Sequence, residues 1–384
     1  MDMKFASYFN EDHEAIREVA RDFANNTLAP IAADIDKNEK FPMEVVSQMA
    51  ELGFLGLKIP EEYGGLGMDM RSYVCVMEEI ARKCATATIF ISSANSLSTE
   101  PVLLFGTEEQ KQMYVPGVAA GEQFVAFGLT EPGAGSDAGS LKTKAVKDGD
   151  DYILNGRKCF ITMAPFADYS VIFAKTSPEK GTRGITAFMV DMKLPGVSCG
   201  KPEEKMGQRG VRVSDIILED VRVPASCIIG EVDKGFTNAM KTLNVGRIGV
   251  ASMSIGMASE ALDIAVEYTK NREQFGKPLA AQQALRFMMA DMQTRLNAAK
   301  LLVYDAAYRM DIGDPDATAA ASMAKYYAAE NAQWIIDRAL QLHGGYGYSR
   351  EYAIERLYRD IRICSIYEGS SQVQQIVIAG NLLK

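Results

Sequence analysis

Hydrophobic and polar positions divide the chain into three stretches with different periods. From Asn10 to about Glu122, apolar residues recur every three or four positions, which is the spacing of a buried stripe on amphipathic helices. From about Phe124 to Ile229, β-branched and polar residues alternate, which predicts strands. After about Gly235 the helical period returns in long segments rich in Ala and Met. The pattern therefore predicts helices, then strands, then helices.

The middle stretch is expected to form antiparallel hairpins. Turn residues at Asp148-Gly149-Asp150 and at Asn155-Gly156 interrupt the alternating pattern. Strands that follow one another without intervening helices favour a small barrel or sandwich over a parallel βαβ sheet. The strands are predicted within residues 140–162, 169–176, 184–192 and 213–224.

The last stretch predicts a four-helix bundle, because its helical segments are long and are separated by short Gly or Pro breaks. Their Ala-rich faces permit close approach of helices, and a second subunit could cover what they leave exposed. The predicted fold is a multidomain α+β protein. Its expected domains are a helical domain at 1–124, an antiparallel β-barrel or sandwich at 125–234 and a helical bundle at 235–384.

Composition narrows the class of protein. The chain has 384 residues and a formal net charge of −9, which argues against nucleic acid as a partner. Six scattered cysteines without a CxxC pair, together with two histidines, make a zinc site or a disulfide framework unexpected. The N-terminus "MDMKFASYFNEDHEAI" lacks a signal-peptide core, and no apolar run approaches the ~18 residues of a membrane span. We expect a cytoplasmic protein without a metal ion.

Three segments contain candidate binding chemistry, and each also has an ordinary structural explanation. The loop "TEPGAGSDAGS" (130–140) matches a dinucleotide fingerprint in form, but the β-rich sequence after it excludes a Rossmann unit. It is either a loop that exposes N–H and hydroxyl donors or a plain Gly-rich connection. In "KCFIT", Phe160 and Thr162 share one face of a strand, with Ile161 on the other, and can contact a flat heteroaromatic ring. The same pattern also fits any half-buried strand.

Two further loops interrupt the last helical region. "NREQFGKP" contains Arg272, Gln274 and Phe275, and "QLHGGYGYSREYAIERLYRD" (341–360) contains a Gly-Gly-x-Gly break. Backbone without Cβ atoms can approach a pyrophosphate closely, although either loop is equally compatible with a helix stop. Near the C-terminus, Glu368 precedes Gly369 between two apolar segments. On its own, it fits a solvated turn before the last helix.

Taken together, these segments resemble the acyl-CoA dehydrogenase family, most nearly its types acting on short-chain, branched or cyclic acyl groups. "GLTEPGAGSDAGS" (128–140), the segment 341–360 and "YEGSSQ" (367–372) match its signature motifs and catalytic loop, and the likeness covers the whole chain. The resemblance implies FAD-dependent α,β-dehydrogenation of an acyl-CoA thioester, with a hydride passing from the β carbon to flavin N5. It further implies an electron-transfer flavoprotein as the electron acceptor.

By this resemblance Glu368 is the catalytic base for the α proton. Its apolar neighbour Ile366 and Tyr367 indicate desolvation, which raises the pKa of a carboxyl group. The N–H of Gly369 is expected to help hold the thioester oxygen. Some relatives carry the base on an earlier helix, at the position of Gly246, which cannot act here.

The resemblance also assigns binding residues. Arg272, Gln274 and Gln283 are expected to reach the FAD of a neighbouring subunit, which implies a homotetramer built as a dimer of dimers. The substrate contacts it implies are Ser136, Asn244, Arg247, Tyr367 and Gly369. The FAD contacts it implies are Phe127, Leu129, Thr130, Ser136, Phe160, Ile161, Thr162, Arg272, Gln274, Phe275, Gln283, Gln341, Gly344, Gly345, Ser370 and Gln372.

Departures from the family pattern limit the substrate prediction. Relatives usually have Asp at position 244, commonly Trp at 160 and "NGG" within the rim 163–168. Relatives that oxidise glutaryl-CoA have an Arg in the helical segment near Thr88. This chain has "ATATIF" there, which disfavours a dicarboxylic acyl group. Thr88, Ser92 and Asn95 are instead expected to line a modest acyl pocket.

Two other functions remain open from the sequence alone. One is a flavin oxidase or monooxygenase of the same fold; monooxygenase relatives generally lack the acid at position 368, and oxygen consumption would identify either. The other is a flavin-free binding protein of the same shape, which would purify without colour.

Overall fold

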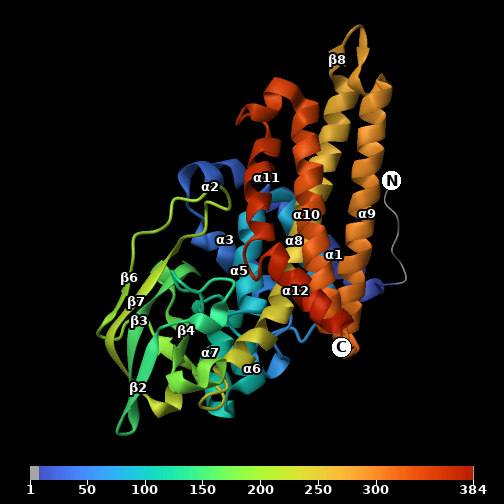
Figure 1. Ribbon diagram of the computed structural model, residues 1–384. Helices are drawn as coiled ribbons and strands as arrows, with labels where there is room; N and C mark the ends of the chain where they lie inside the picture. The colour runs from blue at the N-terminus through green and yellow to red at the C-terminus, as the bar shows by residue number, and fades with distance from the viewer. Residues whose placement is uncertain (1–7, 384) are drawn as a thin grey trace.

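The computed structural model describes residues 8–383 and confirms the predicted division into helices, a curled sheet and helices (Figure 1). Residues 1–7, which belong to the segment expected to lack a signal peptide, and residue 384 lie outside the described range. The N-terminal helices are α1 (Glu11–Phe23), α2 (Ala32–Asn38), α3 (Met43–Glu51), α4 (Met70–Lys83), α5 (Ala85–Asn95), α6 (Glu100–Phe105) and α7 (Glu108–Ala119).

Side-chain caps define where several of these helices begin. The side chain of Asn10 accepts a hydrogen bond from the N–H of His13 at the start of α1, and Thr107 does the same for the N–H of Gln110 in α7. Asp69 caps α4 by accepting from the N–H of Ser72. Each cap satisfies a backbone donor that the helix leaves unpaired, typically for about 1 kcal/mol.

The middle part is one seven-stranded sheet in the order β1-β4-β2-β3-β7-β6, with β5 paired to β4. Most pairs are antiparallel as predicted, but β4 pairs in parallel with β1 and, at one position, with β2, so the sheet is mixed. The β2–β3 hairpin lies between β1 and β4 along the chain, so the paired strands β1 and β4 are not consecutive. The strands are β1 (Val125–Gly128), β2 (Lys144–Asp148), β3 (Asp151–Thr162), β4 (Tyr169–Lys175), β5 (Ile185–Asp191), β6 (Val197–Cys199) and β7 (Val213–Pro224).

One predicted turn is wrong. Asp148-Gly149-Asp150 does join β2 to β3, but Asn155-Gly156 lies inside β3 at a register shift against β7. Asn155 pairs there with Asp220 of β7 through two hydrogen bonds of 2.9 Å. A Cβ at Gly156 would lie 2.4 Å from the hydroxyl of Thr143, so glycine is required by close approach and not by a turn.

The C-terminal part is built on the 37-residue helix α8 (Gly235–Asn271). It is the one helix in residues 8–383 that is long and apolar enough to cross a membrane by composition, but 89% of its most apolar window is buried inside the protein, as in a core helix. The other helices are α9 (Gln283–Asp311), α10 (Ala317–His343), α11 (Ala353–Ile361) and α12 (Ser371–Leu382).

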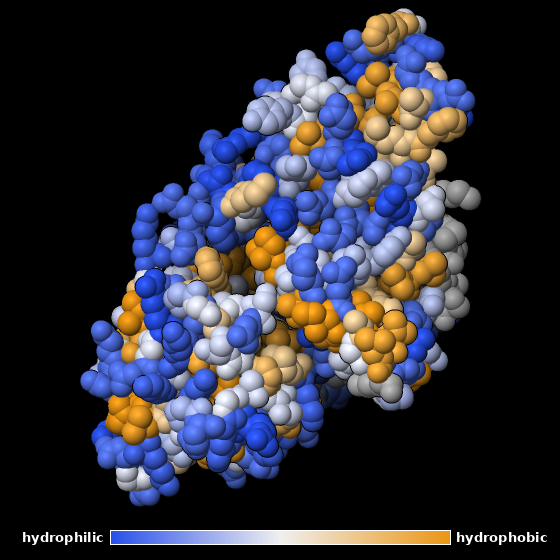
Figure 2. Space-filling model, viewed as in Figure 1, coloured by the Kyte–Doolittle hydropathy of each residue, from blue (hydrophilic) through white to orange (hydrophobic). Residues whose placement is uncertain are grey.

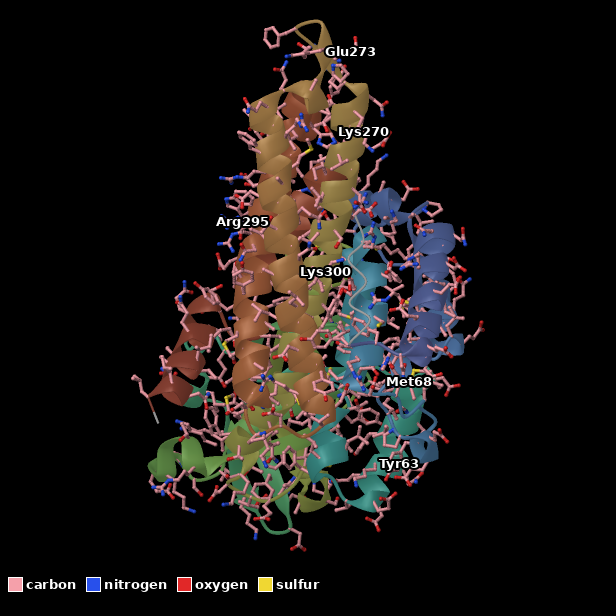
Figure 3. The ribbon with its side chains drawn as sticks, turned by 90° about the vertical axis from the view of Figure 1, so that its right-hand side faces the viewer. Tyr63, Met68, Lys270, Glu273, Arg295 and Lys300 are labelled. Atoms are coloured by element: carbon pink, nitrogen blue, oxygen red, sulfur yellow. The ribbon has the colours of Figure 1, made fainter. Side chains whose placement is uncertain are left out.

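A small hairpin joins α8 to α9 at the end of the molecule far from the sheet (Figure 1). It consists of β8 (Glu273–Gln274) and β9 (Lys277–Pro278). Figure 3 shows Glu273 in this hairpin at the opposite end from Tyr63 of the N-terminal part. Within one chain the hairpin is therefore remote from the sheet.

Glycines allow α8 to pack closely against α4. An added Cβ at Gly256 would lie 2.3 Å from the carbonyl oxygen of Glu78, and one at Gly249 would lie 2.4 Å from the phenol oxygen of Tyr73. Neither position tolerates a side chain without a shift of its neighbours. This contact fixes the N-terminal half of α8, which forms one wall of the cavity described below.

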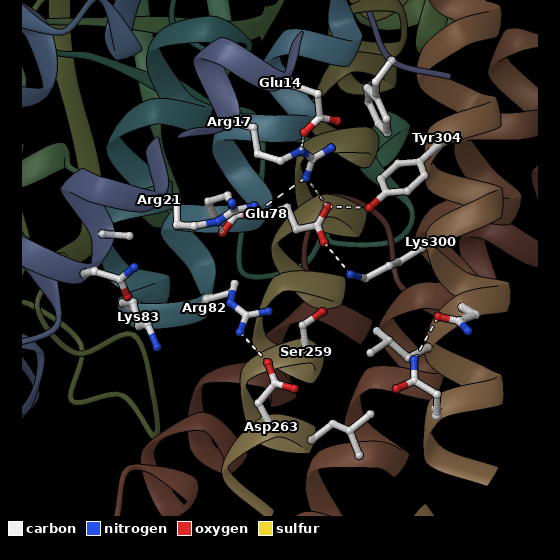
Figure 4. A pocket seen from close by; sticks show the side chains of 18 of the residues that line it. Glu14, Arg17, Arg21, Glu78, Arg82, Lys83, Ser259, Asp263, Lys300 and Tyr304 are labelled. Carbon is white, nitrogen blue, oxygen red and sulfur yellow. Dashed lines mark hydrogen bonds and ion pairs between the residues drawn. The ribbon is translucent and has the colours of Figure 1, made fainter. Parts of the chain in front are cut away.

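A buried ionic network joins α1, α4 and α9 beside this contact (Figure 4). The carboxylate of Glu78 lies 2.8 Å from the ammonium of Lys300 and 3.2 Å from Arg17, and it accepts a 2.6 Å hydrogen bond from Tyr304. Burial would raise the pKa of Glu78, but Lys300 and Arg17 outweigh burial and lower that pKa to about 2. The charges that surround this cavity of about 930 Å³ pair with one another, so we assign it a structural role.

We expect Glu78→Gln to lower the free energy of unfolding at pH 7 by about 3 kcal/mol, because it removes the carboxylate bound to Lys300 and the nearest of the carboxylates around Arg17. The folded pKa of about 2 lies below the ordinary value of 4.5. The contribution is therefore complete above about pH 4.5 and is lost as the pH falls through about 2. Thermal unfolding between pH 7 and 2 should show the difference from wild type shrinking. A difference that stays constant with pH would contradict this assignment; the exposed Glu204→Gln is the control.

Candidate active site

A cavity of about 340 Å³ lies where the sheet, α4, α5 and α8 meet the segment before α12. Figure 2 shows the surface hollowed between the sheet and the helical part, with hydrophobic residues along its edge. Eleven of the residues predicted as site residues line this one cavity: Phe127, Leu129, Thr130, Ser136, Phe160, Ile161, Thr162, Arg247, Tyr367, Glu368 and Gly369. Segments more than 240 residues apart in the sequence therefore meet here.

Glu368 enters the cavity from a left-handed turn. Its φ is +52° and that of Gly369 is +90°, so two successive residues adopt the region that disfavours side chains. The Oε2 atom of Glu368 is inaccessible to solvent and has no hydrogen-bond partner within residues 8–383. A buried carboxylate oxygen without a partner is costly in an empty site and is suited to accepting a proton from a ligand.

The surroundings of Glu368 bring the pKa of its carboxyl group close to 7. Burial raises the pKa of its carboxyl to about 7, and the positive charges of Lys325 and Arg247 limit that rise. At this pKa the group is divided between its acid and base forms near pH 7. It can therefore both take up and release a proton at physiological pH.

Arg247 belongs to a cluster of neutral hydrogen-bonding groups. Its Nη1 atom donates to the side-chain oxygen of Asn244 at 2.9 Å and to the hydroxyl of Ser322 at 3.4 Å. Asn244 does not line the cavity and in turn donates to Thr318 at 3.1 Å. The Nε of Arg247 is buried without a partner in the described chain. The guanidinium thus has no carboxylate bound to it and directs its charge toward Glu368.

Gly246 lies directly against the carboxyl group of Glu368. An added Cβ at position 246 would be 1.8 Å from Oε2 of Glu368, which is far inside contact distance. The carboxyl group therefore occupies space on α8 that a side chain would otherwise fill. The absence of a side chain at Gly246 is a geometric requirement for this position of Glu368.

The backbone of Gly369 presents one bound and one unbound group. Its carbonyl oxygen accepts hydrogen bonds from Lys325 at 2.8 Å and from Gln374 at 2.9 Å. Its N–H makes no hydrogen bond among the described residues. An unused N–H beside an unpaired carboxyl oxygen is the donor and acceptor pair that enolate formation requires.

Strand β3 contributes an exposed aromatic ring and a threonine hydroxyl to the lining of the cavity. Phe160 is 67% exposed, with φ of +56°, at an irregularity where the pairing of β3 with β7 shifts between Lys158 and Ile161. Ile161 is buried and Thr162 is half-buried, and all three residues line the cavity, so the predicted separation of Ile161 from the other two is not seen; the left-handed Phe160 interrupts the alternation of a regular strand. A planar heterocycle fits here, with an aromatic ring and a threonine hydroxyl beside it.

A second group of predicted residues forms a separate open cleft of about 940 Å³ near the β8–β9 hairpin. Added Cβ atoms at Gly344 and Gly345 would meet nothing within 4 Å, so the backbone there is open to a ligand. The ring nitrogen Nε2 of His343 is buried without a partner in the described chain and belongs to the lining of this cleft. The predicted residues in it are Arg272, Gln274, Gln341, Gly344 and Gly345. Open backbone, amides and a guanidinium suit the phosphates of a dinucleotide.

Four other predicted cofactor residues line neither cavity. Phe275 is 94% exposed at the tip of the hairpin, and Gln283 is exposed at the start of α9. Ser370 caps α12 by accepting from the N–H of Val373, and Gln372 is exposed on that helix. Their predicted contacts would need a ligand or a second subunit that reaches them.

Two of the three residues expected to line an acyl pocket are found in the lining of the cavity. Thr88 and Ser92 line the cavity, but Asn95 does not. The side chain of Asn95 is fully used in holding backbone, because it bonds to Lys58 N–H and to the carbonyls of Phe54 and Ile91. The asparagine is structural.

Several residues of the site were not predicted. Lys325 was hidden in an Ala-rich helical stretch, where a lysine normally marks a solvated face. The apolar lining was also missed, because in the sequence of a helical segment an apolar residue that lines a cavity looks the same as one in the hydrophobic core. These residues are Met77, Leu97, Phe236, Met240, Leu243 and Met253.

Comparison with known families agrees with this geometry. Three family models match in order along the chain: the acyl-CoA dehydrogenase N-terminal domain at residues 10–122, the middle domain at 126–221 and the C-terminal domain at 233–383.

Two curated relatives and one solved structure are similar over nearly the whole chain. A "3-(aryl)acrylate reductase" of Clostridium sporogenes is 58% identical, covering 98% of this chain and 100% of the relative. The "Caffeyl-CoA reductase-Etf complex subunit CarC" of Acetobacterium woodii is 57% identical with the same coverage. The structure of butyryl-CoA dehydrogenase from Megasphaera elsdenii superimposes with a TM-score of 0.95 at 41% identity and covers 100% of both chains.

Proposed function

This chain belongs to the acyl-CoA dehydrogenase family of FAD-dependent enzymes, and we propose that it moves hydrogen between an acyl-CoA thioester and its 2,3-unsaturated counterpart. The observation that carries the proposal is the unpaired Oε2 of Glu368, buried in the cavity to which β3 contributes an aromatic ring and a threonine hydroxyl. When bound, FAD supplies the acceptor for the hydride that leaves C3.

The protein's own residues supply proton transfer and charge stabilisation. Glu368 takes the proton from C2 of the thioester, and the free N–H of Gly369 donates to the thioester oxygen, where negative charge develops. In the opposite direction, protonated Glu368 returns the proton to C2. A pKa of about 7 permits both directions at neutral pH.

The FAD is proposed to lie between two subunits. Phe127, Phe160 and Thr162 would contact its ring system, while Arg272 and Gln341 of a neighbouring copy would hold its phosphates. The two cavities support this proposal, because they share no lining residue. Only the cleft of about 940 Å³ includes a residue of the remote β8–β9 hairpin. Each site would be incomplete without a second copy, and the exposed Phe275 would be covered by it.

We further propose the state and partners of the protein. It is a homotetramer in the cytoplasm, and its electrons are exchanged with an electron-transfer flavoprotein; the name of the Acetobacterium woodii relative, which calls that protein a subunit of a reductase–Etf complex, supports this partner. The proposed domain ranges are 1–124, 125–234 and 235–384; the ranges of the three family models support them. Light scattering of the FAD-loaded protein should give four chains, and a monomer that retains FAD would contradict the shared site.

The proposed substrates are CoA thioesters with short or 3-aryl-substituted acyl groups. The names of the two curated relatives refer to arylacrylate and caffeyl groups, which are unsaturated at C2 and C3. The cavity lining contains one basic residue, Arg247, which lies beside Glu368. The hydroxyl of Thr88 donates to the carbonyl of Ala85, so it is not free to pair with a second carboxylate.

The test is anaerobic reduction of the bound flavin by a panel of saturated acyl-CoAs, followed by reoxidation with their 2-enoyl counterparts. Straight-chain butyryl-CoA, 3-phenylpropionyl-CoA, an isobutyryl-CoA and glutaryl-CoA make a sufficient panel. We expect bleaching by a short or arylated member and none by glutaryl-CoA. Bleaching by none of them would contradict the proposed function, and rapid oxygen consumption without another acceptor would indicate an oxidase.

A further inference from the structure

Among residues 8–383, Lys158 and Lys325 are buried and Lys300 is partly buried, and Lys325 differs from the other two in its partners. The ammonium of Lys158 lies 2.8 Å from the carboxylate of Glu131, and that of Lys300 lies 2.8 Å from Glu78. Lys325 has no exposed surface, yet it makes no ion pair among residues 8–383. Its ammonium donates instead to the carbonyl oxygen of Gly369 at 2.8 Å.

A buried ammonium without a bound carboxylate is expensive for the fold. Moving an ammonium group from water into the protein interior typically costs several kcal/mol unless a partner group offsets that cost. Burial lowers the pKa of Lys325 to about 8, so the group is still mainly charged at pH 7. The retained charge is bonded to Gly369, the residue next to the proposed catalytic base. A buried charge kept at this cost in such a place indicates a functional role.

The bond from Lys325 holds the turn from which Glu368 projects. Glu368 and Gly369 both have left-handed φ values, a pair of conformations that surrounding contacts must maintain. The neutral amide of Gln374 is the second donor to the same carbonyl, at 2.9 Å. The two donors therefore differ in charge while sharing an acceptor, which provides an internal comparison.

We propose that Lys325 is a positioning residue for the catalytic base: its hydrogen bond holds the Gly369 carbonyl, which fixes the direction of the Glu368 carboxyl. Its positive charge also favours the ionised form of that carboxyl. The inference rests on the proposed function. No proton passes through Lys325, and no bond to it forms or breaks.

The charged and titratable groups that face Glu368 come from several elements. Arg247 faces it from α8 and Lys325 from α10, and both favour the carboxylate. The buried phenol of Tyr73 faces it from α4, and Tyr367 adjoins it in the chain. Both phenols have pKa values raised by burial and stay neutral near pH 7. Cys364 interacts with Lys325 but is likewise a buried neutral thiol. Arg247 and Lys325 are therefore the two positive charges that set the acidity of Glu368.

The test compares Lys325→Met with Gln374→Leu in the FAD-loaded protein, using anaerobic flavin reduction by the best acyl-CoA of the panel as the readout. Lys325→Met should slow reduction at pH 7 by about 10- to 100-fold. It should also move the pH profile up by about one unit, because loss of a cation raises the pKa of Glu368. Gln374→Leu should slow reduction without moving the pH profile, since it removes a neutral donor.

Controls separate this role from a structural one. Lys300→Met removes a partly buried lysine that does not line the cavity of Glu368, and it should destabilise the protein while leaving the pH profile of flavin reduction unchanged. Lys325→Arg retains the charge and should keep the wild-type profile even where its rate falls, which also serves if the Met variant does not fold. A pH profile in Lys325→Met equal to that of wild type, with a rate within twofold, would overturn the inference. Failure of wild type to bleach with any acyl-CoA would instead overturn the proposed function.

Discussion

Glu368→Gln should leave the protein yellow and folded but reduce the rate of flavin reduction by acyl-CoA about 10³-fold or more. The amide has the shape of the carboxyl group and cannot accept the C2 proton. FAD binding should persist, because the amide keeps the volume of the side chain against the cavity wall. Stopped-flow absorbance under anaerobic conditions measures the rate, and the visible spectrum measures the bound flavin.

Glu368→Gln should also change the pH dependence of thermal stability, and this change tests whether the carboxyl group of Glu368 is buried in the folded protein. The pKa of Glu368 in the folded protein, about 7, exceeds the ordinary value of 4.5. Wild type therefore loses stability as the pH rises from about 4.5 through 7, whereas the Gln variant does not. The variant should melt at a higher temperature than wild type at pH 8 and close to it at pH 5. Loss of bound flavin in Glu368→Gln, with activity lost for that reason alone, would contradict the assignment of a base.

Gly246→Ala should reduce activity by about 10²-fold or more while leaving the protein at least as stable as wild type. The added Cβ would collide with Oε2 of Glu368, which lies 1.8 Å from its position, so the carboxyl group must leave its place. Alanine at the same time favours a helix over glycine by about 1 kcal/mol. Opposite changes in stability and activity are the expected signature, measured by thermal unfolding and by flavin reduction.

A matched control is available on another helix. Gly380 in α12 has nothing within 4 Å of an added Cβ, so Gly380→Ala tests the gain in helix stability without a steric contact. It should leave flavin reduction unchanged. If Gly246→Ala kept wild-type activity, Glu368 would not occupy the position described above during catalysis.

The periodicity of the sequence was sufficient to predict the order of helices and strands, because each part buries one apolar face. It was not sufficient to predict that β1 pairs with β4 in parallel, since the β2–β3 hairpin separates these two strands along the chain. The Asn155-Gly156 pair has the composition of a turn, but close approach by Thr143 explains its glycine equally well. A single sequence does not distinguish these two reasons for a glycine.

The motifs and the family resemblance predicted eleven of the residues that line the cavity, because the chemistry of the site is concentrated in short loops with unusual composition. The residues around Glu368 that adjust its acidity were harder to identify. Lys325 lies in an Ala-rich helix where its charge gives no local signal, and its importance follows from its burial and from its bond to Gly369. Position 246 was recognised as a place without a base, but its contact with Oε2 required the three-dimensional arrangement.

Exchange of the C2 hydrogens of a bound saturated acyl-CoA with solvent tests the central role of Glu368 most directly, because exchange reports proton transfer at C2 apart from hydride transfer at C3. The protein, loaded with FAD, is incubated anaerobically in deuterated water with an acyl-CoA that bleaches it, and deuterium at C2 is measured by mass spectrometry. We expect incorporation of deuterium at C2 with wild type and none above background with Glu368→Gln. Incorporation at equal rates in the two proteins would show that Glu368 is not the base.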